Sequence, residues 1–76
     1  MLNKNQIDLI KQTFGEVVKE LRDQHNLSQE KLGFAADLDL TSINEIEKGH
    51  RNPKLTTVCK LAKALGVSPS ALLKNL

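Results

Sequence analysis

Residues 28–49 read SQEKLGFAADLDLTSINEIEKG and predict two short helices joined by a tight turn. Ser28 suits an N-cap position, because its oxygen can accept from the free N–H groups that open a helix. Asp39 can cap the second helix, and Gly49 can end it in the left-handed conformation. Asp37 lies where the turn needs a left-handed residue. The segment therefore predicts a helix-turn-helix, whose second helix can enter the major groove of DNA.

Apolar residues that recur every three or four positions predict three further helices, so the expected fold is all-α, with five helices and no strand. The first covers residues 5–25, in which Gly15 suggests close approach by another element. A helix over 55–65 ends at Gly66, and Ser68 begins a terminal helix over 68–76. The residues expected to face the core are Ile7, Ile10, Phe14, Val17, Leu21, Leu32, Ala35, Ala36, Ile43, Ile46, Leu55, Val58, Leu61, Ala62 and Leu65.

Size and composition predict a single domain over residues 1–76. The chain is 39% hydrophobic, and at this length the net stability should be about 4–11 kcal/mol. The single cysteine excludes an internal disulfide, and Cys59 is expected to pack as a small hydrophobe. Residues 1–12 are interpreted as an extension of the first helix or an arm. Because no signal-peptide or membrane-spanning pattern is found, we expect a cytoplasmic protein without a membrane partner.

Positive charge is concentrated in the second half of the chain. Residues 1–40 carry five Lys/Arg and seven Asp/Glu, whereas residues 41–76 carry six Lys/Arg and two Asp/Glu. The respective net charges of −2 and +4 place cations on and after the second motif helix, where DNA phosphates would be met. A solvated basic surface without a partner is the alternative interpretation.

Catalytic and cofactor-binding patterns are not found, so we expect neither an enzyme nor a cofactor, metal ion or small-molecule ligand. Glu45 and Glu47 are two positions apart on a helix and point to different faces, which excludes a paired acid and base. The only aromatic residues, Phe14 and Phe34, are both expected in the core. A base-stacking platform for single-stranded nucleic acid is therefore not expected.

The outer face of the second motif helix carries candidate base-reading residues. Thr41 can hydrogen-bond a base or contact a thymine methyl, Asn44 can pair with adenine, and Glu45 can accept from a cytosine amino group. In the alternative, Glu45 pairs with Lys48 one turn along the helix. We expect base contacts from Leu40, Thr41, Ser42, Asn44 and Glu45, and phosphate contacts from Ser28, Gln29, Lys48, Arg51 and Lys54.

The chain closes with Leu72, Leu73 and Leu76, more apolar surface than a one-turn helix needs in order to dock. Leu72 or Leu76 is expected to lie on the core. The remaining surface suits self-association, so the three leucines are predicted dimer contacts. In the alternative, all three complete the core.

The stretch from Phe14 to Leu73 resembles the Cro/repressor-type helix-turn-helix regulators, also called the XRE family. Its most specific segments are LSQEKL at 27–32, INEIEKG at 43–49 with the following RNP, and LAKALGVSPSALL at 61–73. The resemblance implies a lambda-repressor-like domain that binds operator DNA as a symmetric dimer. It implies a phosphate contact for Gln29, a site near the DNA backbone for Lys48, base contacts for Leu40, Thr41 and Glu45, and a structural ion pair between Arg22 and Glu47.

Three residues depart from the family pattern. Leu40 replaces a residue that is often polar or basic, Asp37 stands where Gly is common, and Lys54 stands where a small cap is common. The leucine weakens the case for direct readout at its position, because it offers a base only an apolar contact.

The expected function is sequence-specific binding of double-stranded DNA by a homodimeric transcriptional regulator, with recognition helices about 34 Å apart. A stand-alone repressor, a restriction–modification controller and an antitoxin that represses its own operon all fit. The alternative class is a protein-interaction module, such as an antitoxin or anti-repressor whose main partner is another protein. Leu40 and the small net charge leave room for this alternative.

Overall fold

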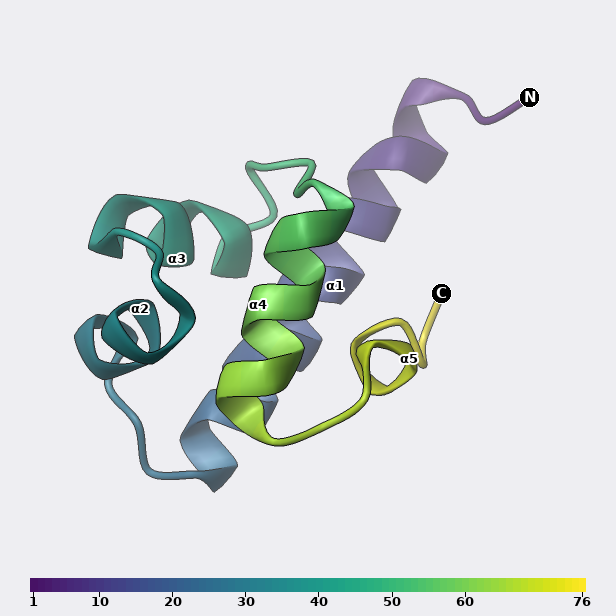
Figure 1. Ribbon diagram of the computed structural model, residues 1–76. Helices are drawn as coiled ribbons and strands as arrows, with labels where there is room; N and C mark the ends of the chain where they lie inside the picture. Colours follow the sequence, from purple (N-terminus) through teal and green to yellow (C-terminus); the bar gives the residue numbers. More distant parts are fainter.

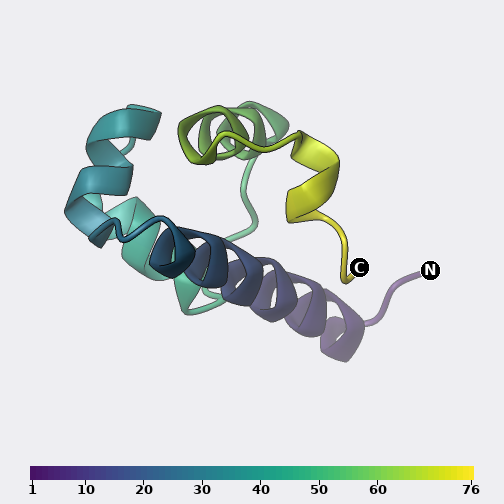
Figure 2. The same ribbon diagram turned by 90° about the horizontal axis from the view of Figure 1, so that it is seen from below.

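The computed structural model describes all residues 1–76 and contains five helices and no strand, which confirms the predicted all-α fold. Figure 1 shows α4 lying across α1, with α2 and α3 on one side and α5 on the other. Figure 2 shows the same arrangement from below. None of the helices combines the length and apolar character needed to cross a membrane. The helices are α1 (Lys4–Gln24), α2 (Gln29–Ala36), α3 (Leu40–Glu47), α4 (Leu55–Leu65) and α5 (Pro69–Leu72).

The helix-turn-helix forms where its capping residues predict it. The Ser28 hydroxyl accepts from the backbone N–H of Lys31 at 3.0 Å, which starts α2. Asp37 ends this helix in the left-handed conformation, with φ 56° and ψ 47°. The Asp39 carboxylate then accepts from the backbone N–H of Ser42 at 2.6 Å and starts α3. Short-range polar chemistry therefore sets both helix starts and the turn between them.

Two glycines allow the motif to pack closely. A Cβ on Gly33 would lie 2.6 Å from the carbonyl oxygen of Leu38 in the turn. A Cβ on Gly15 of α1 would overlap the carbonyl oxygen of Ile46 and lie 2.9 Å from that of Glu47. Both glycines allow close backbone contacts that a larger residue would block. Gly15 in this way lets α3 pack against the middle of α1.

A single core joins all five helices. Its side chains are buried, and each large apolar one contributes about 1.5–3 kcal/mol through its removal from water. The core residues are Phe14, Val17 and Val18 of α1, Leu32 and Ala36 of α2, Ile43 and Ile46 of α3, Val58, Leu61, Ala62 and Leu65 of α4, and Leu72 of α5.

Several residues expected in or beside the core are exposed instead. Phe34 is 92% exposed, and Ala35 also faces solvent, because Leu32, Gly33 and Ala36 form the buried face of the short helix α2. The prediction that both aromatic residues lie in the core is therefore wrong for Phe34.

The ends of two helices explain the other departures. Ile7 is exposed and Ile10 only half-buried, because the amino end of α1 extends beyond the rest of the molecule (Figure 1). Leu55 is 81% exposed at the first position of α4, before that helix enters the core. Cys59 is also exposed, since it lies around the helix from buried Val58. The predicted packing of Ile7, Leu55 and Cys59 is thus wrong.

The two ends of the chain differ in how far their helices extend. Asn3 and Gln6 form reciprocal side-chain-to-backbone bonds of 2.9 Å that start α1, so residues 4–12 are helical. The terminal helix is shorter than the predicted 68–76, because α5 ends at Leu72 after one turn. Only that leucine reaches the core, and the residues after it continue as a turn.

Candidate nucleic-acid interface

Helix α3 is anchored by one face and exposed on the other. Ile43 and Ile46 are 0% and 2% exposed and fix its inner face in the core. Thr41 is exposed on the outer face, and Leu40 is 50% exposed at the first helical position. The first turn, the part of a recognition helix that reaches base edges, is therefore open to a partner.

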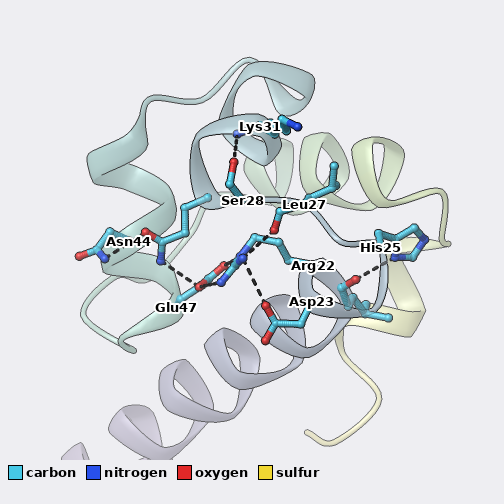
Figure 3. Close-up of polar contacts among 10 residues, drawn as sticks. Arg22, Asp23, His25, Leu27, Ser28, Lys31, Asn44 and Glu47 are labelled. Atoms are coloured by element: carbon cyan, nitrogen blue, oxygen red, sulfur yellow. Dashed lines mark hydrogen bonds and ion pairs between the residues drawn. The ribbon is translucent and has the colours of Figure 1, made fainter.

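A buried ion pair fixes α3 to α1. Arg22 donates from Nε to Oε2 of Glu47 at 2.7 Å and from Nη2 to Oε1 at 3.0 Å (Figure 3). The two side chains are only 10% and 3% exposed. Arg22 also donates to the carbonyl oxygen of Leu27 at 2.7 Å. The hydrogen bond to Glu47 raises the pKa of Arg22, so the structure contains the charged pair that the family resemblance implies.

Gln29 and Asn44 extend this ion pair toward the outer face. Gln29 Nε2 donates to Oε1 of Glu47 at 3.0 Å, and Asn44 Nδ2 donates to Oε1 of Gln29 at 3.3 Å. Both side chains are half-buried. Gln29, the predicted phosphate contact, and Asn44, a predicted base contact, are therefore hydrogen-bonded to each other.

Glu45 pairs with Arg51 from the loop after α3. Nη2 of Arg51 lies 3.2 Å from Oε1 of Glu45, and the side chains are 43% and 37% exposed. The alternative partner, Lys48, makes no ion pair. The exposed side of α3 thus presents a carboxylate together with a guanidinium, a pairing that no helical spacing indicates because the cation lies outside the helix.

A pocket of ≈ 260 Å³ lies between α3, the following loop and α4. Ser42 lines it from α3, so this half-buried residue faces the loop rather than the outermost side of the helix. Arg51 and Lys54 line it from the loop and give it a positive rim. Lys48 and Lys54 are exposed and make no ion pair, which leaves both cations available to an anion.

The capping side chains of the two motif helices accept hydrogen bonds from the backbone of the helices that they begin. The hydroxyl of Ser28 is engaged in capping α2, although the helix start that it marks remains at the surface. Hydrogen bonds from the backbone and side chain of Ser42 lower the pKa of Asp39. Asp39 therefore stays charged near neutral pH and holds the first turn of α3 in its helical conformation.

The leucines near the carboxyl end separate into two groups. Leu72 is 0% exposed and belongs to the core, so it is not available as a dimer contact, and that assignment is wrong. Leu73 is 41% exposed and Leu76 is 55% exposed. The single turn of α5 turns one leucine inward and leaves these two at the surface.

Comparison with known proteins identifies the family. The helix-turn-helix family HTH_3 matches residues 18–72, most of the chain. The chain belongs to this family. The match includes the last third of α1 and all of α2, α3, α4 and α5, whereas residues 1–17 lie outside it.

The similar proteins are regulators. Control protein C.BamHI of Bacillus amyloliquefaciens is 48% identical over 65 residues, which cover 84% of this chain and 80% of the relative. Control protein C.SmaI of Serratia marcescens is 42% identical over 64 residues, which cover 84% and 76%. The crystal structure of the restriction–modification controller protein C.AhdI from Aeromonas hydrophila has a TM-score of 0.79 and 41% identity, and the match covers 80% of this chain and 92% of that one.

This helix-turn-helix protein is a DNA-binding regulator of transcription, as the resemblance implied, and its family is not one of enzymes. Two hydrogen-bonded contacts within the site could not be predicted from the sequence. The Gln29–Asn44 bond joins different helices, and the Glu45–Arg51 pair joins a helix to a loop. Only the packing of α2 and the loop against α3 brings these residues together.

Proposed function

We propose that this protein is a controller of restriction–modification genes that binds a two-fold symmetric operator as a homodimer in the cytoplasm. The observation that carries the proposal is the outer face of α3, which is open at Thr41 while the Arg22–Glu47 pair fixes the opposite side. A rigid helix with an open first turn suits insertion into the major groove. The similarity to the restriction–modification controller protein C.AhdI, over 92% of that chain, supports the choice of regulated genes.

In this proposal the base contacts come from α3. Thr41 and Glu45 read hydrogen-bonding groups, Asn44 reads a third base, and Leu40 contacts a thymine methyl. Ser42 contributes at the edge of the helix, consistent with its half-buried position beside the pocket. Each good hydrogen-bonded contact discriminates by about 1–3 kcal/mol.

Phosphate contacts flank the base-reading face. The free cations Lys48 and Lys54 serve on one side, together with Arg51. On the other side, the amino end of α2 presents Ser28 and Gln29, where backbone N–H groups and the helix dipole favour an anion. Such contacts set the register of the helix in the groove without reading sequence.

The proposed dimer forms through Leu73 and Leu76. Both leucines are exposed beside α5, which lies on the opposite side of the molecule from α2 (Figures 1 and 2). Pairing two copies there buries apolar surface and leaves both motifs free. Recognition helices one DNA turn apart, about 34 Å, would then match the two halves of the operator.

Selection from random duplex DNA tests this function. The full-length protein is expected to enrich a two-fold symmetric sequence, and Thr41→Ala and Glu45→Ala should each relax the preference at particular positions of that sequence. Lys48→Ala is the matched control, because loss of a phosphate contact weakens binding to all duplexes alike. Failure of the wild-type protein to enrich any sequence would contradict the proposal. The restriction–modification assignment is tested by placing the enriched sequence upstream of such genes in a reporter, where expression must respond to the protein.

A further inference from the structure

A polar network joins four side chains, and all of its hydrogen bonds are donated in one direction. Its members are Arg22, Glu47, Gln29 and Asn44. Arg22 donates to the Glu47 carboxylate, Gln29 Nε2 donates to the same carboxylate at 3.0 Å, and Asn44 Nδ2 donates to Gln29 Oε1 at 3.3 Å. Each hydrogen bond in the series is therefore donated toward Glu47, either by Arg22 or by a residue nearer the surface.

The direction follows from the chemistry of the buried end. An ionised carboxylate only accepts hydrogen bonds, so the Gln29 amide must present its nitrogen to Glu47. Its oxygen then faces Asn44, which must donate through Nδ2 in turn. The orientation of each amide is thus determined by its neighbour, and the series begins at a glutamate whose side chain is 3% exposed.

The consequence appears at Asn44. One of its two N–H groups is used by Gln29, which leaves the Oδ1 acceptor and one N–H donor for a partner. Figure 3 shows the Asn44 amide oxygen on the side away from Glu47. An acceptor beside a donor is complementary to adenine in the major groove, whose N6 amino group donates and whose N7 accepts. Guanine presents two acceptors, O6 and N7, and cannot satisfy Oδ1.

We infer that the buried Arg22–Glu47 pair, acting through Gln29, sets the orientation of the Asn44 amide and so makes Asn44 select adenine over guanine at one position of each operator half-site. Gln29 is a positioning residue in this arrangement. The inference rests on the proposed DNA-reading function of α3 and adds the base that Asn44 selects and the residues that determine the choice.

Two substitutions of Gln29 separate positioning from simple contact. Gln29→Lys keeps a donor toward Glu47 but offers Asn44 a donor instead of an acceptor. Asn44 should then turn Oδ1 inward and present N–H donors to the DNA, so its preference should shift from adenine toward an acceptor edge such as that of guanine. Gln29→Leu removes both bonds and should leave Asn44 free to adopt either orientation.

The experiment measures affinities for the selected operator with each of the four bases at the position that Asn44→Ala alters. Wild-type protein should prefer adenine to guanine by about tenfold or more. Gln29→Leu should bring this ratio close to one, and Gln29→Lys should invert it, while preferences at the other positions persist. Glu30→Gln is the matched control, because it makes the same change in charge at the adjacent exposed residue and should retain the wild-type ratio.

The outcomes are distinguishable. If the wild-type protein enriches no sequence, the proposed function fails and this inference fails with it. If an operator is enriched but folded Gln29→Leu and Gln29→Lys proteins keep the wild-type adenine preference, only the inference is overturned. The same holds if Asn44→Ala changes no position. A uniform loss of affinity in Gln29→Leu, with the adenine preference intact, would show that Gln29 acts through phosphate alone.

Discussion

The Glu47 carboxylate of α3 accepts two hydrogen bonds from the Arg22 guanidinium of α1, at 2.7 and 3.0 Å, and both side chains are almost completely buried. The pair joins the end of the recognition helix to the longest helix of the domain. Because the Arg22 side chain also donates to the Leu27 carbonyl, it holds the connection between α1 and α2 as well. The orientation of the exposed face of α3 thus depends on a buried contact behind it.

Removal of one partner should therefore destabilise the fold strongly. Glu47→Ala removes the buried partner of Arg22 and leaves the guanidinium only the exposed Asp23 carboxylate, at 3.3 Å. Breaking a buried pair in this way typically costs about 3–5 kcal/mol. This is a large part of the total of about 4–11 kcal/mol expected for 76 residues. Urea unfolding monitored by circular dichroism measures the loss. Glu45→Ala is the matched control, because its pair with Arg51 is more than one-third exposed and should contribute only about 0–1 kcal/mol. Equal losses in the two variants would contradict the structural role of the buried pair.

The Asp39 cap predicts a component of stability that depends on pH. Hydrogen bonds from the Ser42 backbone and side chain lower the pKa of Asp39 in the folded protein, whereas the unfolded chain has the ordinary value of about 3.9. The unfolded state therefore binds the proton more tightly. The stabilising contribution is present above about pH 3.9 and is lost as the pH falls through the lower, folded-state value.

Thermal unfolding between pH 7 and pH 2 tests the Asp39 cap. Asp39→Asn retains an acceptor for the Ser42 N–H but does not titrate in this range. The Tm of the wild-type protein should therefore fall further with acid than that of the variant. Parallel Tm profiles for the two proteins would show that the charge of Asp39 contributes nothing.

The Glu45–Arg51 pair predicts a change in the salt dependence of DNA binding. Glu45→Gln removes the carboxylate that neutralises Arg51 and should free this cation for a phosphate. On duplexes without the operator, the slope of log Kobs against log salt should then steepen by about 0.9 per subunit. A titration of affinity between low and moderate salt measures the slope. Glu45→Gln combined with Arg51→Ala should not steepen it, and an unchanged slope in Glu45→Gln alone would mean that the Glu45 carboxylate does not keep Arg51 from phosphate.

Substitutions of the leucines around α5 should have different effects, because Leu72 is buried and Leu73 and Leu76 are exposed. Leu73→Glu or Leu76→Glu should shift the sedimentation mass toward the monomer, because a charge would enter the proposed dimer contact. Leu72→Ala should instead lower the free energy of unfolding by about 2–5 kcal/mol, since it leaves a cavity in the core.

Phe34→Glu is the control for the dimer contact. It introduces the same charge at a more exposed apolar residue, on α2, across the molecule from α5 (Figure 1). The control should leave the sedimentation mass of the wild-type protein unchanged. An unchanged mass in both Leu73→Glu and Leu76→Glu would remove the case for this interface.

The sequence predicted those parts of the fold that depend on neighbouring residues. Ser28 and Asp39 cap the two motif helices because their side chains reach backbone N–H groups three positions away. Ile43 and Ile46 lie on the buried side of α3 because both belong to one helical face, which the turn places against α1 and α2. Caps and periodicity are properties of the local chain, so they can be identified without the tertiary structure.

The remaining features depend on which elements meet in space. Phe34 and Leu55 are apolar, but Phe34 lies off the buried face of α2 and Leu55 precedes the buried part of α4, so both are exposed. The link from Gln29 to Asn44 and the pairing of Glu45 with Arg51 require α2 and a loop to return to α3. The sequence identified the type of these side chains but not their partners, and the partners determine which groups remain for DNA.

The outer face of α3 is proposed to read the sequence of duplex DNA. The most direct test is the ratio of affinities for the selected operator and for a scrambled duplex of the same length, measured at one fixed salt concentration. The wild-type ratio should be about a thousandfold or more. Thr41→Ala and Glu45→Ala should each lower it by about fivefold or more, while the scrambled duplex is bound nearly as well by Thr41→Ala and at least as well by Glu45→Ala. A wild-type ratio close to one, or a ratio unaffected by both substitutions, would contradict the claim.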